Sequence, residues 1–183
     1  MSHPVSTKDK LLTVARAMFW TRGYSNVSVR DITKAAGVDA ALVSRYFGSK
    51  FGLFEATLSE IPEWEALEAA PEDLLSAAVA SFSHPYDPDV DQANPFTMLL
   101  ANVIDPEIGA HVRGMVQQKL ADPLTERLDG PNAEDRATML LAALFGMALM
   151  RKNFQLKSLA TASLDEIEAQ TRHLAEAAIR YDA

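Results

Sequence analysis

Apolar residues recur along this chain at the three-to-four-residue spacing of amphipathic helices, and no stretch alternates as a half-buried strand would. In the first such segment, 7–22, Leu11, Ala15 and Phe19 share one face. Gly23 follows at the position where a glycine commonly ends a helix. Similar spacing, interrupted by Gly and Pro, continues to the C-terminus and predicts an all-α protein.

Two short helices separated by a glycine turn come next. Ser28 opens the first of them, and Asp31 stands three residues later, as in a capping box. Gly37 ends this helix, and Asp39 can cap the second one, predicted over 40–47. A helix, a tight turn and a short helix of this size predict a helix-turn-helix, whose second helix enters the major groove of DNA.

The rest of the chain is expected to be helical as well. A fourth helix is predicted over 50–67, and further helices are predicted over 71–82, 95–103, 106–128, 133–154 and 164–181. Pro123 should kink or divide the segment 106–128, because proline has no N–H for the helical hydrogen bond. Residues 84–94 should form a linker. We therefore expect a three-helix DNA-binding domain within 7–60 and a second helical domain at 61–183.

Charge is distributed unevenly along the chain. The net charge is −8, yet the first 53 residues carry eight Lys or Arg against three Asp, a net charge of +5. The remaining residues carry −13. A basic segment on an acidic protein is expected when one part contacts phosphates. Hydrophobic residues make up 48% of the chain, which favours a packed core.

Patterns typical of enzymes and metal sites are missing from the sequence. There is no cysteine, and the four histidines lack ligand spacing. Asp87, Asp89 and Asp91 resemble the start of a calcium loop, but Gln92 stands where glycine is required. We expect no catalysis, no cofactor and no metal. Without a signal-like or membrane-spanning stretch, a cytoplasmic location with no membrane contact is expected.

Three motifs in fixed order resemble the DNA-binding domain of the TetR family of regulators. They lie within 11–58 and run A-x-x-x-F-x-x-x-G-Y, V-R-D-I-x-x-A-A-G-V and Y-F-G-S-K-x-x-L-F. The other two thirds of the chain resembles family members only in size, helix content and helix order. The resemblance implies a homodimer with an all-helical body, a ligand cavity and, in most members, repression of transcription.

Eight residues are expected to contact operator DNA: Ser28, Arg30, Ala40, Ala41, Ser44, Arg45, Tyr46 and Lys50. By the resemblance, Lys50 contacts a phosphate at the start of the fourth helix, where backbone N–H groups also favour an anion. Tyr46 matches a position that supports the recognition helix or bonds a phosphate. Ser28 and Arg30 match positions that approach the DNA backbone or a groove edge.

Side-chain chemistry indicates which residues distinguish bases. Arg45 can form two hydrogen bonds to guanine, while Ala40 and Ala41 can contact thymine methyl groups. A phosphate contact or a solvated side chain stays open for Arg45. Ser44 stands where the family more often has tyrosine, and Gly52 replaces a residue that favours helix.

The second domain is expected to bind a small, mainly apolar effector, because its roughly 120 residues carry no catalytic set. The cavity should lie among the helices predicted at 71–82, 95–103 and 106–128, with the linker 84–94 as its entrance. Expected lining residues are Phe82, Phe96, Leu99, Leu100, Val103, Met115 and Phe145. Ordinary core packing is the alternative role for these side chains. Tilting of the fourth helix, expected to be the only covalent connection between the domains, should transmit the signal.

The last two long helices should pair with their copies in a partner and form a four-helix bundle. The expected contact residues are Leu140, Leu141, Leu144, Leu164, Ile167 and Leu174. The alternative is that both helices pack only on their own domain. Two other function classes also stay open: a helical ligand carrier that does not bind DNA, and a helical enzyme. Binding to random DNA separates these from a regulator.

Overall fold

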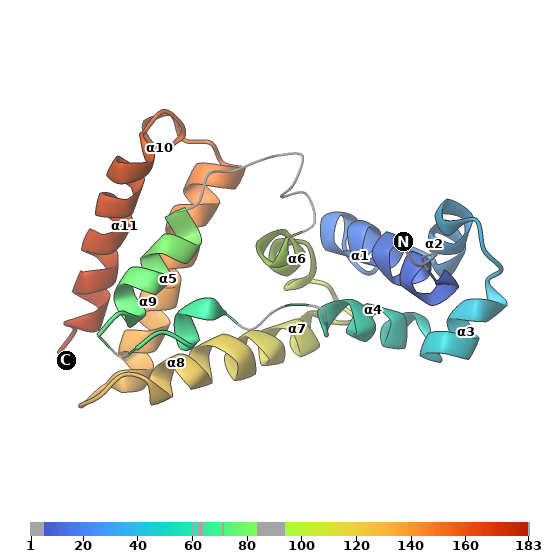
Figure 1. The fold of residues 1–183 in the computed structure, drawn as a ribbon, viewed down its shortest axis with the longest axis horizontal. Helices are drawn as coiled ribbons and strands as arrows, with labels where there is room; N and C mark the ends of the chain where they lie inside the picture. The colour runs from blue at the N-terminus through green and yellow to red at the C-terminus, as the bar shows by residue number, and fades with distance from the viewer. Residues whose placement is uncertain (1–5, 60, 62–63, 71, 84–93, 183) are drawn as a thin grey trace, which may run out of the picture. The chain divides into compact units, whose positions relative to one another are not determined.

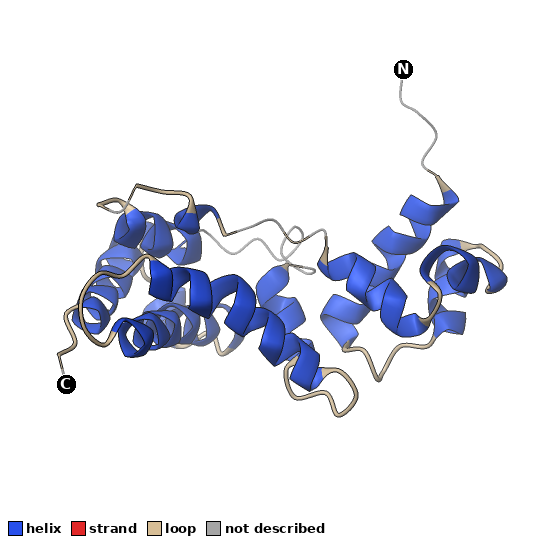
Figure 2. Ribbon diagram, turned by 90° about the horizontal axis from the view of Figure 1, so that it is seen from below, coloured by secondary structure: helices blue, strands red, loops and turns tan. Residues whose placement is uncertain are grey.

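A computed structural model describes residues 6–59, 61, 64–70, 72–83 and 94–182, and these residues form only helices and their connections (Figure 2). The expected all-α class is thus confirmed. The helices fall into two compact units, Met1–Pro62 with Asp87–Gly114 and Glu63–Tyr86 with Met115–Ala183. The two units are not consecutive along the chain, as the predicted domains were, because residues up to Gly114 belong to the N-terminal unit. The chain passes between the units three times, so the expectation that the fourth helix is the only covalent connection is wrong.

The first unit is built around a long first helix (Figure 1). Its elements are α1 (Thr7–Arg22), α2 (Val29–Ala36), α3 (Ala41–Phe47), α4 (Lys50–Leu58) and α6 (Pro95–Asn102). Helix α1 packs against α2, α4 and α6. Leu11 and Phe19 of α1, Ile32 of α2, Phe54 of α4 and Met98 of α6 are all completely buried. The helix-turn-helix therefore shares its core with a helix from much later in the sequence.

Local capping explains the helix boundaries of the first unit. The Ser28 side chain accepts a hydrogen bond from the N–H of Asp31, and the Asp31 side chain accepts one from the N–H of Ser28, which confirms the predicted capping box. Gly37 has a φ of 65°, in the left-handed region that glycine adopts without strain. The expected fourth helix over 50–67 is too long, because α4 ends at Leu58 with Ser59 as its C-cap.

Buried hydrogen bonds explain why α6 belongs to the first unit. Asn102 is completely buried, and its Oδ1 accepts a hydrogen bond of 2.8 Å from the backbone N–H of Tyr24. Its Nδ2 donates to the carbonyl of Phe19 at 3.1 Å. A Cβ on Gly23 would lie 2.8 Å from the carbonyl oxygen of Ala101, so glycine allows this close approach of the backbones.

The second unit surrounds its own apolar core. Its elements are η1 (Glu65–Leu67), α5 (Leu74–Ser83), the π-helical turn η3 (Gln117–Ala121), α8 (Asp122–Glu126), α9 (Ala133–Ala148), the π-helical turn η4 (Leu149–Asn153), α10 (Lys157–Ala160) and α11 (Leu164–Ile179). Helix α11 packs against both α9 and α5. Leu74, Ala78, Leu140, Leu144 and Ala175 are among the residues that fill the core.

The longest predicted helix is divided, as Pro123 suggested. Helix α7 (Gly109–Val116) begins in the first unit, and the turn η3 separates it from α8, which contains Pro123. The proline ring would collide with the carbonyl of Lys119 in a regular α-helix, and the wider π turn includes that residue. The expected helix 133–154 likewise ends in a π turn, and α10 was not predicted. The linker at 84–93 lies outside the described residues.

Candidate nucleic-acid interface

Helix α3 exposes one narrow face. Ala41, Ser44 and Arg45 are exposed at three- and four-residue spacing, and Ala40 directly before the helix is exposed too. Val43 is only 2% exposed and holds the opposite face in the core. The carboxylate of Asp39 accepts a hydrogen bond of 2.7 Å from the N–H of Ala41 and thereby caps the helix start. The expected base-contacting residues thus share one outward face, and their DNA contacts stay predictions.

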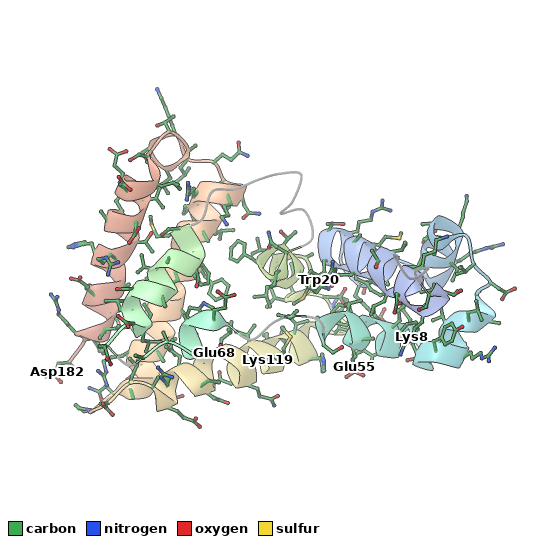
Figure 3. The ribbon with its side chains drawn as sticks, viewed as in Figure 1. Lys8, Trp20, Glu55, Glu68, Lys119 and Asp182 are labelled. Atoms are coloured by element: carbon green, nitrogen blue, oxygen red, sulfur yellow. The ribbon has the colours of Figure 1, made fainter. Side chains whose placement is uncertain are left out.

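Basic side chains flank α3. The ammonium of Lys8 lies 5.9 Å from the ring centroid of Phe47 at the end of α3, and Figure 3 labels Lys8 on α1. The guanidinium carbon of Arg45 lies 6.0 Å from the ring centroid of Tyr46, which is 38% exposed. Lys8 was missing from the expected site, because only the fold brings the start of α1 beside α3.

The expected phosphate-binding lysine rests on an aromatic ring. The ammonium of Lys50 lies 3.9 Å from the ring centroid of Tyr24. That ring is 5% exposed and is held by Phe19 and Phe54, whose centroids lie 5.5 and 5.4 Å away. An ammonium over an aromatic face gains electrostatic stabilisation. Tyr24 therefore holds the Lys50 side chain at the first turn of α4, where the helix dipole is positive.

Two carboxylates influence the ring beneath Lys50. Burial raises the pKa of Tyr24, and the negative charges of Glu107 and Asp105 raise it further. Tyr24 is therefore neutral at physiological pH. Burial would also raise the pKa of Asp105, but hydrogen bonds from Ser25, Glu107 and Ile108 together lower it below its ordinary value. Asp105 is therefore an anion that holds the N–H of Ser25 at 3.0 Å.

Ser28 and Arg30 lie at the start of α2, and both are exposed. The hydroxyl of Ser28 donates a hydrogen bond of 2.6 Å to the carboxylate of Asp31. This hydroxyl and the Ser28 backbone N–H lower the pKa of Asp31, because both stabilise the ionised carboxylate. The Ser28 hydroxyl has a single proton. It could donate a hydrogen bond to DNA only by giving up the one that it donates to Asp31.

Gly52 explains how α3 and α4 meet. A Cβ on Gly52 would overlap the carbonyl oxygen of Phe47, the last residue of α3. The side chain of Ser49 accepts a hydrogen bond of 2.9 Å from the N–H of Gly52 and caps α4. The missing methyl group therefore lets the end of α3 lie against the first turn of α4, which compensates for the poor helix propensity of glycine.

Comparison with known proteins identifies the family. The model of the bacterial regulatory proteins of the tetR family matches residues 11–57. A second model, the tetracyclin repressor-like C-terminal domain, matches residues 65–179, which is more than half of the chain. The chain belongs to the TetR family. Members of this family are transcriptional regulators, so the alternative of a helical enzyme is not supported.

Two relatives with similar sequence each match about a third of this chain. Over 59 residues the chain is 48% identical to the probable HTH-type transcriptional regulator YttP of Bacillus subtilis (strain 168), covering 32% of this chain and 28% of that protein. Over 63 residues it is 36% identical to the HTH-type transcriptional repressor KstR2 of Mycolicibacterium smegmatis, covering 34% of this chain and 31% of that protein. The matches thus span under a third of each relative's length.

Solved structures share the fold over nearly the whole chain. A TetR-family regulator from Streptomyces coelicolor A3 is 24% identical, with a TM-score of 0.59 and 98% of each chain covered. A regulator from Aquifex aeolicus VF5 is 17% identical, with a TM-score of 0.67, covering 94% of this chain and 99% of that chain. CifR, complexed with 26-base-pair operator DNA, is 20% identical, with a TM-score of 0.65, covering 97% of this chain and 98% of that chain. At these identities the similarity concerns the fold.

The expected effector-lining residues of this TetR-family protein are divided between the two units. Residues of α6 and its C-cap belong to the first unit: Phe96, Leu99, Leu100 and Val103. Phe82, Met115 and Phe145 belong to the second unit. The rings of Phe82 and Phe145 are in contact, with centroids 5.2 Å apart. The seven residues therefore do not share one compact unit, and their role in binding an effector stays a prediction.

Most of the expected dimer contacts are wrong. Leu140, Leu144 and Ile167 are at most 1% exposed, and Leu141 is 8% exposed. These four side chains pack inside their own protomer and cannot form a contact surface. Leu164 and Leu174 are 46% and 44% exposed and remain available. Helical periodicity identified the two apolar helices but assigned the buried face of α9 to the partner.

Two further findings concern the described part of the chain. Within it, no group of three or more His, Asp or Glu side chains is placed to hold a metal ion. No helix there combines the length and the apolar character needed to cross a bilayer.

Proposed function

We propose that this protein is a ligand-responsive transcriptional repressor that binds near-palindromic operator DNA as a homodimer in the cytoplasm and is released by a small, mainly apolar effector. The observation that carries the proposal is the exposed face of α3, which includes Arg45 and is flanked by Lys8 and Lys50. The relative KstR2 is named a repressor, and CifR was solved with operator DNA, which supports this role. Lys50 is assigned to a phosphate and Arg45 to a guanine edge.

A second copy is needed for specificity. The short α3 presents only about four outward side chains, too few to select one site in a genome. Two recognition helices related by a two-fold axis would contact two half-sites about one helical turn apart. Exposed residues at helical spacing offer a surface for this dimer: Met139 and Ala142 on α9, and Leu174 and Ala177 on α11. Small alanines on this surface permit close helix packing.

The effector is assigned to the second unit. This unit contains no metal-binding cluster among its described residues, and its half-buried aromatic side chains adjoin a closed apolar core. An effector can release DNA only by binding more tightly to a conformation in which the two α3 helices do not fit the operator. A hundredfold preference corresponds to about 2.7 kcal/mol, which a few buried apolar contacts supply.

Selection of bound sequences from a random DNA pool tests the DNA-binding role, followed by affinity measurements at several salt concentrations. Lys50→Ala should weaken binding to every sequence and reduce the salt slope by about 2 for a dimer, because it removes one phosphate contact per protomer. Arg45→Ala should instead relax preference at one base pair per half-site, at a cost of about 1–3 kcal/mol.

The exposed Lys119 of the second unit provides the matched control, since Lys119→Ala removes the same charge elsewhere. This variant should bind like the wild type. Uniform weakening by Arg45→Ala would rule out base contact by that residue. Failure to select any sequence would favour the ligand carrier without DNA binding.

The effector role is tested by screening apolar compounds for an increase in the melting temperature. Each hit is then added to the preformed operator complex. We expect at least one hit to lower operator affinity tenfold or more. Hits that stabilise the protein and leave operator affinity unchanged would rule out release by an effector.

A further inference from the structure

One tryptophan in the second unit has an unsatisfied hydrogen-bond donor. Trp64 directly precedes η1, and its Nε1 is closed off from solvent and has no hydrogen-bond partner in the described part of the structure. The other tryptophan provides the contrast. Nε1 of Trp20 donates a hydrogen bond of 3.0 Å to the hydroxyl of Thr57. Buried indole N–H groups ordinarily find such a partner, so Trp64 requires an explanation.

Trp64 lies at one end of a row of three aromatic rings. Its ring and that of Phe82 on α5 are nearly perpendicular, with centroids 5.8 Å apart. Phe82 in turn meets Phe145 of α9 at 5.2 Å. All three side chains are partly buried and pack on the core of the second unit. An aromatic face is at best a weak acceptor for an N–H group, so Phe82 does not satisfy the indole.

The row of rings adjoins a closed core. Ala66, Leu74, Ala78 and Leu144 beside the rings are at most 3% exposed. The three rings come from separate segments, the chain before η1, α5 and α9, so a molecule that contacts all of them would tie these segments together. The surroundings favour an apolar, planar molecule, and the donor adds a requirement for one hydrogen-bond acceptor.

The acceptor that fits this site is uncharged. The guanidinium of Arg127 donates to the backbone carbonyls of Leu67 and Ala69, and that of Arg151 donates to the carbonyl of Ser83 at the end of α5. Both cations are therefore engaged by backbone carbonyls. A carboxylate at Trp64 would be desolvated beside apolar rings, which is costly without a paired charge. A carbonyl oxygen satisfies the indole without this cost.

We propose that Trp64, Phe82 and Phe145 form the effector-recognition site, and that the effector is a planar, uncharged aromatic compound whose carbonyl oxygen accepts a hydrogen bond from Nε1 of Trp64. This inference rests on the proposed effector-responsive function and specifies the chemical class of the effector. Phe82 and Phe145 contact its rings, and Trp64 selects compounds that carry the acceptor. A compound of the same shape without the oxygen leaves the donor unsatisfied and binds less tightly.

Two matched pairs of compounds test the proposal on the entire 183-residue chain: acetophenone against ethylbenzene, and 2-acetylnaphthalene against 2-ethylnaphthalene. In each pair only the first compound carries a carbonyl. Binding is followed through the two indole Nε1–H signals in ¹H–¹⁵N spectra of labelled protein without DNA. Trp64→Phe assigns the signals, because one of the two disappears.

We expect the acetyl compound of at least one pair to move the Trp64 signal downfield and leave the Trp20 signal in place. It should bind about 10-fold more tightly than its ethyl partner, equivalent to about 1.4 kcal/mol. Trp64→Phe should retain a ring but abolish this preference. Trp20→Phe, the same substitution in the first unit, should preserve it.

No response of the Trp64 signal to either pair would overturn the inference. A preference for the acetyl compound that persists in Trp64→Phe would overturn it as well. Operator release is measured separately. Binding at Trp64 that leaves operator affinity unchanged contradicts the proposed release mechanism but not the site, whereas release by compounds that leave Trp64 undisturbed contradicts the site alone.

Discussion

At the scale of single residues, Tyr24 joins the core of the first unit to its DNA-binding surface. Its ring packs between Phe19 and Phe54, and its outer face carries the ammonium of Lys50. Ordering a lysine side chain costs up to about 2 kcal/mol of conformational entropy. Because the Tyr24 ring already holds the ammonium near the first turn of α4, we expect Lys50 to lose less conformational entropy when it binds the proposed phosphate.

Tyr24→Leu should therefore weaken operator binding about 3- to 10-fold relative to Tyr24→Phe, because only phenylalanine retains the aromatic face. Competition binding with labelled operator measures the effect. The comparison is repeated in combination with Lys50→Ala, where the two substitutions at Tyr24 should become equivalent. Equal effects with and without the lysine would show that Tyr24 acts through packing alone.

Asp105 makes stability depend on pH. Although burial opposes it, hydrogen bonds to Ser25, Glu107 and Ile108 lower the pKa of Asp105 in the folded protein. In the unfolded chain the pKa returns to about 3.9. The carboxylate therefore stabilises the fold above that pH, and this stabilisation is lost as the pH falls through the lower, folded-state pKa.

Asp105→Asn should lower the free energy of unfolding by about 1–2 kcal/mol at pH 7, since asparagine retains only one of the two acceptors. The difference from the wild type should shrink steadily below pH 4, as the wild-type carboxylate becomes protonated. Urea unfolding between pH 7 and pH 3 measures it. A difference that stays constant across this range would exclude the charge of Asp105 as its cause.

At the scale of helices, α6 is connected to the DNA-binding surface by a short physical route. Asn102 of α6 holds the backbone N–H of Tyr24, and the ring of Tyr24 holds Lys50. A displacement of α6 along its own axis would break the first of these contacts and change the position of the second. We expect this route to act beside α4, the predicted transmitter, when an effector changes the DNA-binding surface.

Asn102→Leu should destabilise the first unit by about 1–3 kcal/mol, because it leaves the buried N–H of Tyr24 without an acceptor. Met98→Leu on the same helix is the control, since an apolar exchange of similar volume costs less than about 1.5 kcal/mol. Urea unfolding is followed by Trp20 fluorescence in protein that also carries Trp64→Phe. Equal stability of the two variants would contradict a structural role for the amide.

Capping residues and glycines allowed the helix-turn-helix to be predicted almost to the residue, because Ser28, Asp31 and Gly37 act through local geometry. The assignment of α6 could not be predicted in this way. The hydrophobic spacing of α6 predicts that one of its faces is buried, but it does not predict which of the two units supplies the core. Only the contacts of Asn102 with Tyr24 and Phe19, which lie 78 and 83 residues earlier in the sequence, decide that question.

At the scale of the whole molecule, the proposed dimer needs an apolar surface that the protomer does not use itself. Met139, Leu174 and Tyr181 are each about 40% exposed, whereas the leucines predicted from periodicity are buried. Both faces of α9 are apolar, so sequence alone could not separate the protomer core from the partner surface. A test of the dimer should therefore substitute an exposed residue and not one of the buried leucines.

Ala177→Asp should dissociate the dimer and abolish operator binding without unfolding the protomer, because Ala177 is exposed on α11 and the aspartate would be desolvated at the interface. Ala80→Asp introduces the same change at an exposed alanine of α5 and should leave the dimer intact. Light scattering gives the mass, and circular dichroism confirms the helix content. A dimeric Ala177→Asp variant with full operator affinity would contradict the proposed interface.

Gly52, in the first turn of α4, is a position where helix propensity predicts the wrong effect of a substitution. A designer who compares Gly52 with helix propensities, or with the residue usual in the family, would exchange it for alanine and expect a gain in stability. The carbonyl of Phe47 occupies the space of the added methyl group, so the exchange would force the end of α3 to move. The missing Cβ of Gly52 therefore sets how the end of α3 lies against α4. We expect Gly52→Ala to shift α3 and so to change the DNA sequences that the protein binds.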